Sequence, residues 1–342
     1  MTQFKYFVGV DIASSTFTAS VGTMPWQVLL KPEEFENTED GFQTWLAWLI
    51  QHQVAPEDTI VCMEATGVYG EGLAYFAVAK GYAVAVQPPL EVKRAFKPNL
   101  RKSDAVDSLQ IAEYAGRFAD KLSFWQPRSE VLEQIKVLLA TREQFVAQNT
   151  AHKNGLKAIQ RKPVKTPFAE QAHLQMIQFF KKQILAIDTE IRRLMENDPT
   201  FKQMLFLLLS VPGVGLLLAA HMILLTQVSL DYKQLNSFLG FAPNEYSSGS
   251  SVYGHPTSRH FGPAAIRKLL YLAACSVIAH RAQFRIYFSR MTKAGKPSRL
   301  ILNNIENKLV KIICAVLRTN LPYDPNYLSV QPLVLKNSLT GS

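Results

Sequence analysis

The succession of short apolar segments in the first 87 residues most limits what this chain can fold into. Strand-like segments of the right length and alternation are expected at residues 4–11, 14–21, 26–30, 59–64 and 82–87. Helical patterns separate the later ones: Phe42, Trp45 and Leu49 share one helical face, and residues 69–80 form a second helix. The order of three strands, helix, strand, helix, strand and helix predicts an α/β domain with an antiparallel start.

Carboxylates stand at the ends of two of these strands. Asp11 closes the first strand and Glu64 the fourth, and strand ends are where an α/β sheet presents its chemistry. Asp104 and Asp107 follow in KSDAVD, where Ser103 can cap a helix and the spacing places both aspartates on one face. Taken singly, each is equally explained as a turn former or helix cap. Together, on a ribonuclease H-like strand order, they favour a site for Mg²⁺, which takes oxygen ligands and activates phosphates.

A helical region follows the α/β domain. Residues 130–160 and 169–195 predict two helices, interrupted by Pro163 and Pro167. In the second helix the apolar residues repeat at steps of three and four, as in a coiled-coil seam: Ile177, Phe180, Ile184, Ile187, Ile191 and Leu194. An antiparallel hairpin arm with a basic turn is expected, although an ordinary amphipathic helix packed on its own domain also fits.

Residues 204–225 form 22 consecutive positions without Asp, Glu, Lys or Arg. This length could span a bilayer, but Pro212, Gly213 and Gly215 fall at its centre. We therefore expect two short helices joined by a tight turn, in a helix-hairpin-helix pattern whose turn amides can hold a phosphate. A buried hairpin that touches no DNA remains the alternative.

The charge of the chain is unevenly distributed. The net charge is +10, but residues 1–95 hold 5 basic and 11 acidic groups, whereas residues 249–323 hold 12 basic groups and only Glu306 as an acid. A sustained basic surface favours a polyanionic partner such as nucleic acid over a merely solvated face. The three separated cysteines indicate neither a disulfide framework nor a zinc ribbon and fit a reducing cytosol, and no signal peptide is expected.

Several motifs, taken together, resemble one known family. They are VGVDIA with Asp11, MEATGVY with Glu64, KSDAVDS, SVPGVG at 210–215, FLGFAP at 238–243, SSGSSVYG at 247–254 and AAIRKLLY at 264–271. Over residues 5–325 the chain is similar to the DEDD transposases and recombinases of the Piv/MooV invertase type, the insertion-sequence family one hundred and ten.

The resemblance implies a fold that is α/β plus all-α. Its expected parts are a RuvC-like catalytic domain at 1–125, a coiled-coil arm at 126–200, a helical transposase domain with a serine loop at 201–325 and a tail at 326–342. By similarity, Asp11, Glu64, Asp104 and Asp107 are expected to bind Mg²⁺, with Mn²⁺ as a substitute.

The resemblance also implies a nucleophile, Ser248, with Ser250 and Ser251 as fallback candidates. A serine ester with the DNA phosphate conserves the phosphodiester energy, which a recombinase needs to rejoin strands. Candidate nucleic-acid contacts are Lys102, Arg161, Lys162, Lys165, Arg259, Arg267, Lys268, Lys293, Lys296 and Arg299. His255 and His260 lie near the loop and are expected to contact phosphate or only to pack.

The expected activity is site-specific DNA recombination or transposition in the bacterial cytoplasm, at the nucleoid when active, without a membrane partner. The resemblance implies target and donor double-stranded DNA, a bridge RNA that pairs with both, and homodimers assembling to a tetramer. Two alternative activities are a RuvC-like structure-specific nuclease using water and a protein-only DNA invertase. A non-catalytic nucleic-acid scaffold is a third alternative.

Overall fold

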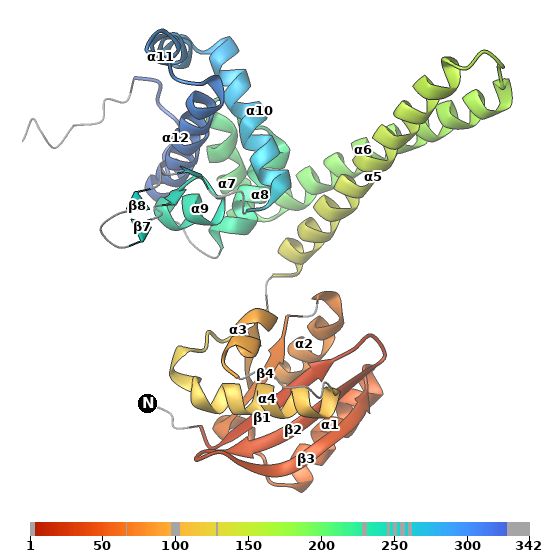
Figure 1. Cartoon of the computed structure of the whole chain (residues 1–342), viewed down its shortest axis with the longest axis vertical. Helices are drawn as coiled ribbons and strands as arrows, with labels where there is room; N and C mark the ends of the chain where they lie inside the picture. The colour runs from red at the N-terminus through yellow and green to blue at the C-terminus, as the bar shows by residue number, and fades with distance from the viewer. Residues whose placement is uncertain are drawn as a thin grey trace, which may run out of the picture. The chain divides into compact units, whose positions relative to one another are not determined.

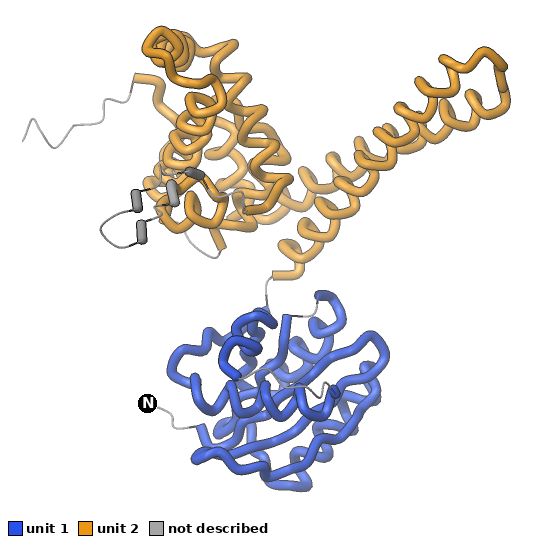
Figure 2. Tube along the Cα trace, in the orientation of Figure 1, with its two compact units in different colours: residues 1–128 blue, residues 129–342 orange. Residues whose placement is uncertain are grey.

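A computed structural model of the chain describes residues 4–65, 67–96, 103–127, 129–227, 231–244, 247–248, 252–253, 257–258 and 262–326. The chain divides into two compact units, residues 1–128 and residues 129–342 (Figure 2). In the described residues, no helix has both the length and the apolar character needed to cross a membrane.

The first unit is built on a five-stranded sheet in the order β3-β2-β1-β4-β5. The strands are β1 (Tyr6–Ile12), β2 (Thr16–Thr23), β3 (Gln27–Glu36), β4 (Thr59–Glu64) and β5 (Ala83–Gln87). The strand β1 pairs antiparallel with β2 and parallel with β4, and β5 continues the parallel side. The ribonuclease H-like α/β order expected from the sequence is therefore confirmed.

Helices cover both faces of this sheet. On one face, α1 (Glu39–Gln51) and α2 (Glu71–Ala79) pack on alternate residues of the central strands, such as Val8 and Val61. On the other face, α3 (Pro89–Arg94) and α4 (Asp104–Arg117) cover the remaining alternate residues, such as Phe7 and Ile60. Because side chains alternate between the faces of a strand, the central strands are buried on both sides.

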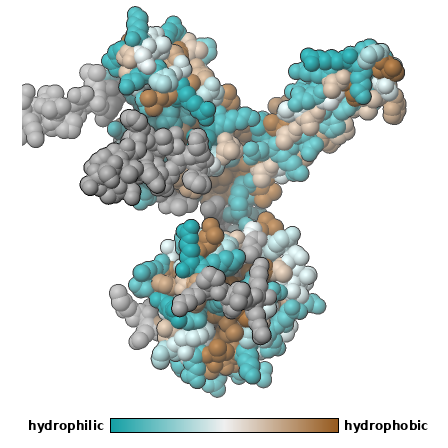
Figure 3. All heavy atoms as spheres, in the orientation of Figure 1, coloured by the Kyte–Doolittle hydropathy of each residue, from teal (hydrophilic) through white to brown (hydrophobic). Residues whose placement is uncertain are grey.

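The second unit is helical. Its helices are α5 (Glu130–Gln160), α6 (Pro167–Asn197), α7 (Pro199–Ser210), α8 (Leu216–Thr226), α9 (Tyr232–Phe238), α10 (Ala264–His280), α11 (Ala282–Lys293) and α12 (Ser298–Thr319). Helices α7 through α12 share one apolar core with the N-terminal part of α5 and the C-terminal part of α6. From this core the paired helices α5 and α6, called here the α5–α6 hairpin, extend away together (Figure 1), and the face of the hairpin seen in Figure 3 is mostly hydrophilic.

Two details of this unit confirm expectations from the sequence pattern. Of the apolar residues that repeat along α6, five are buried and Ile184 is partly buried. The apolar stretch at 204–225 forms α7 and α8 with a turn between them, where Gly213 has a φ of +82° and lies against α10. Pro263 is the N-cap of α10, which begins at Ala264.

Candidate active site and nucleic-acid surface

Strand register places two of the candidate carboxylates side by side. Along the parallel pair β1–β4, Gly9 lies opposite Cys62 and Val10 opposite Met63. Continuing this register by one residue sets Asp11 beside Glu64, on the same face and at the carboxyl ends of both strands. Both residues are partly exposed.

A close approach between α4 and β1 brings the other two carboxylates to this edge. A Cβ atom on Gly9 would lie 2.1 Å from the Ser108 carbonyl oxygen and 2.2 Å from the Ala112 nitrogen. Only glycine therefore allows the helix to cross β1 at this distance. Figure 1 shows α4 crossing the sheet at β1. Ser103 caps α4 by accepting a hydrogen bond from the Val106 N–H at 3.4 Å, so the helix begins directly at Asp104.

Three of the candidate carboxylates act electrostatically on the fourth, Asp11. The pKa of Asp11 is raised to about 6, first because the side chain is half buried, and then because Asp107, Asp104 and Glu64 add negative charge nearby. A hydrogen bond from the Ile12 backbone opposes the shift. The structure thus gathers the residues that the sequence pattern selected into one acidic group.

This acidic group has the donor chemistry of a site for a hard divalent cation. Its ligand atoms are carboxylate oxygens, and a bound cation would offset the repulsion that raises the pKa of Asp11. In the part of the chain that the structure describes, no three His, Cys, Asp or Glu side chains are already arranged to hold a metal.

The predicted serine loop lies in the second unit. Ser247–Ser248 form β7, which pairs antiparallel with β8 (Val252–Tyr253), and Ser248 lies opposite Val252. The strands β6 (Pro243–Asn244) and β9 (Thr257–Ser258) pair on either side of this small hairpin. The candidates Ser250, Ser251, His255, Arg259 and His260 fall outside the described residues, as does Lys102 in the first unit.

The other candidate cations fall into two groups. Arg161, Lys162 and Lys165 are exposed at the turn between α5 and α6, where Lys165 Nζ donates to the Gln160 carbonyl at 2.6 Å. The second group lies along the C-terminal helices, and its members are Arg267, Lys268, Lys293, Lys296 and Arg299. All of the second group are exposed except Arg267, which is partly buried with its guanidinium 5.5 Å from the centre of the Phe241 ring.

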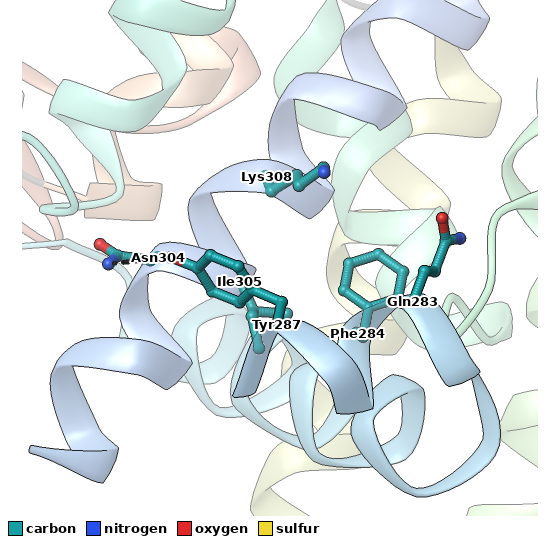
Figure 4. A pocket seen from close by; sticks show the side chains of 6 residues that line it. All are labelled: Gln283, Phe284, Tyr287, Asn304, Ile305 and Lys308. Atoms are coloured by element: carbon teal, nitrogen blue, oxygen red, sulfur yellow. Dashed lines mark hydrogen bonds between the residues drawn. The ribbon is translucent and has the colours of Figure 1, made fainter. Parts of the chain in front are cut away.

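Two features of the second unit were not selected from sequence. Glu306 is buried in α12, and burial raises its pKa to about 7 although Arg267 and Arg299 oppose the shift. In the sequence, Glu306 is distinguished as the only acidic residue in the basic segment 249–323. In addition, α11 and α12 form a pocket of about 140 Å³ (Figure 4), lined by Gln283, Phe284, Tyr287, Asn304, Ile305 and Lys308.

A ribonuclease H-like unit with an acidic sheet edge, followed by a basic helical unit, is an arrangement suited to nucleic-acid strand chemistry. A family model for DEDD transposases of the IS110 type, described as "Transposase", matches residues 8–161. A second model, described as "Transposase IS116/IS110/IS902 family", matches residues 206–289. The chain belongs to the IS110 family of transposases and recombinases and is an enzyme of that class.

Curated relatives are consistent with this family. The pilin gene-inverting proteins of Moraxella bovis and Moraxella lacunata are each 28% identical over 328 residues, covering 94% of this chain and 98% of the relative. The insertion element IS110 uncharacterized 43.6 kDa protein of Streptomyces coelicolor is 26% identical over 142 residues, covering 41% of this chain and 34% of that protein.

Solved structures of RuvC from Thermus thermophilus also match. The RuvC complex with a Holliday junction substrate covers 35% of this chain and 99% of RuvC, with a TM-score of 0.28 and 14% identity.

Proposed function

We propose that this transposase-family enzyme recombines DNA at specific sites through a covalent phosphoserine intermediate, in a reaction that depends on a divalent cation, Mg²⁺ or Mn²⁺. The observation that carries the proposal is half-buried Asp11 at the carboxyl end of β1, with Glu64, Asp104 and Asp107 near enough to raise its pKa. Charge repulsion at this end of the sheet is unfavourable for the protein alone, but a bound cation would offset it and could also hold a DNA phosphate.

In the proposed reaction, Ser248 Oγ attacks a DNA phosphorus atom. The serine–phosphorus bond forms as one phosphorus–oxygen bond of the DNA breaks, and the departing DNA hydroxyl takes the proton. The hydroxyl of a different DNA end then attacks the same phosphorus, and serine leaves as its own hydroxyl. A bound divalent cation would polarise the phosphate and make the serine hydroxyl more acidic.

The carboxylates and Ser248 belong to different compact units. The family resemblance implies that one protomer supplies the carboxylates and another the serine, within a tetramer. We propose this shared arrangement for the present chain, together with guidance by a bridge RNA that the basic residues of the second unit would bind.

Adduct formation tests the catalytic part. The full chain, with any RNA that copurifies, is incubated with Mg²⁺ and a plasmid library, and phosphonucleotide-modified peptides are mapped by mass spectrometry. We expect modification at Ser248, and its loss in Ser248→Ala and in Asp11→Asn. The neighbouring Ser250→Ala and Ser251→Ala variants should retain the adduct. Cut DNA without any adduct would instead identify a nuclease that uses water.

Sequencing of the copurified RNA tests the guide. One structured RNA with segments complementary to the recombined DNA sites is the expected result. Recombination by RNA-free protein would contradict RNA guidance and favour recognition of DNA by the protein alone.

A further inference from the structure

Two histidines meet across the α5–α6 hairpin. His152 Nδ1 and His173 Nδ1 lie 3.1 Å apart and share a hydrogen bond, with the ring centroids 5.2 Å apart. One histidine comes from each helix, 21 positions apart along the chain, and both are partly exposed. An ion in solution can therefore reach a pair of imidazoles that the fold already holds together.

The backbone of α5 is shaped to receive the second histidine. A Cβ atom on Gly155 would lie 2.7 Å from His173 Cε1 and 3.3 Å from its Nε2. Glycine inside a helix costs about 1 kcal/mol relative to alanine. Here it leaves the space in which the His173 ring lies against α5.

An aromatic ring and a buried amide lie on the same helix faces as the two histidines. The Phe180 ring lies 5.7 Å from the His152 ring, at an angle of 32°. Asn149, which precedes His152 by three residues and so shares its helix face, is more than nine-tenths buried. Its Oδ1 has no hydrogen-bond partner among the described residues. A polar layer thus interrupts the apolar contacts between the helices.

We propose that His152 and His173 form a binding site for a divalent transition-metal ion of the Zn²⁺, Ni²⁺ or Cu²⁺ class, with Asn149 Oδ1 or water as further ligands. Imidazole nitrogen is a preferred ligand of these ions. With metal–nitrogen bonds of about 2.05 Å, a separation of 3.1 Å corresponds to an angle of about 98° at the metal, between square-planar and tetrahedral values.

Such an ion would join α5 to α6 in the outer part of the hairpin. Nearer its base the helices are already joined, because Arg142 forms two hydrogen bonds to Asp188 and the lower residues enter the main core. The site differs from the acidic group around Asp11 both in its place and in its nitrogen ligands. Its occupancy does not depend on the proposed recombination reaction.

The test is calorimetric titration of the untagged full chain with Ni²⁺, in excess Mg²⁺ so that the carboxylates are already occupied. We expect one Ni²⁺ per chain. Loss of an outer partner alone typically weakens metal binding about 10–100-fold, so His152→Gln and His173→Gln should each weaken it at least about tenfold. Gly155→Ala should also weaken binding although both histidines remain.

Two control variants test whether other side chains of the chain account for the Ni²⁺ binding. His280→Gln removes an exposed histidine at the end of α10, and Asp11→Asn alters the acidic group; both should bind Ni²⁺ normally. Electron paramagnetic resonance of the Cu²⁺-loaded wild type should show coupling to two nitrogens, a readout that needs no variant. Absence of binding, or normal binding by His152→Gln, would overturn the proposal and leave only a hydrogen-bonded pair.

Discussion

At the scale of single residues, Glu306 is buried, and burial disfavours the ionised form of its carboxyl group. Its pKa rises from 4.5 to about 7, mainly through burial. Below pH 4.5 the carboxyl is protonated in both folded and unfolded chains, so it costs nothing. As the pH rises to about 7 the unfolded chain releases this proton first, and stability falls. Above pH 7 the full penalty is present.

Replacing Glu306 with glutamine should therefore stabilise the protein only at the higher pH. We expect the free energy of unfolding of Glu306→Gln to exceed that of the wild type by about 1–3 kcal/mol at pH 8 and to match it near pH 4. Urea denaturation across this range measures the difference. Glu143→Gln, at an exposed position on α5, is the matched control and should change little. Parallel pH profiles for wild type and Glu306→Gln would contradict the assignment.

Gly9 is the residue that lets α4 approach the sheet. In Gly9→Ala the new methyl group would overlap the backbone of Ser108 and Ala112, so α4 must move away from β1. We expect a loss of stability of about 1–3 kcal/mol or more, and weaker Mn²⁺ binding because Asp104 and Asp107 move with the helix. Thermal unfolding and Mn²⁺ titration test both effects. Gly215→Ala is the control, because a Cβ there meets nothing within 4 Å.

At the scale of elements, Arg142 and Asp188 tie α5 to α6. Their hydrogen bonds are 2.5 and 3.2 Å long, and the side chains are only 21% and 27% exposed. A double-mutant cycle with Arg142→Ala and Asp188→Ala should give a coupling energy of about 1 kcal/mol in urea unfolding. The fully exposed pair Arg193–Glu190 within α6 should give a clearly smaller coupling energy, because solvent screens it. Equal coupling in the two pairs would contradict a bridging role for Arg142.

Elements with a strong apolar period could be predicted from the sequence, whereas close contacts between them could not. The apolar repeat at residues 177–194 lies within α6, and the apolar run at 59–64 is a strand with the expected bounds, because such patterns act locally. The contact of Gly9 with α4 depends on how two distant segments pack, although a glycine inside a strand is a signal of close approach. The facing of His152 and His173 depends on the register of the helix pair, which residue spacing alone does not fix.

At the scale of the whole molecule, the net charge of +10 conceals two opposite regions. Residues 1–95 carry six more acidic than basic groups, and the remaining residues carry an excess of 16 basic groups. Acidic residues around Asp11 could be selected from the sequence because strand order brings them together. Which basic residues touch a polyanion could not be selected, since exposure and charge are shared by contacting and solvated cations alike.

The salt dependence of DNA binding distinguishes cations that contact phosphates from cations that are only solvated. The binding constant K for DNA falls as salt rises, so log K has a negative slope against log salt. Each phosphate contact that is lost reduces the magnitude of this slope by about one. Lys293 and Lys296 are exposed around the turn that follows α11, so the double variant Lys293→Gln/Lys296→Gln should reduce the magnitude of the slope by about two if both touch DNA phosphates. Fluorescence anisotropy with duplex DNA at several salt concentrations measures the slope. Lys31→Gln, exposed in the acidic region, should leave the slope unchanged. An unchanged slope in the double variant would assign both lysines to solvent.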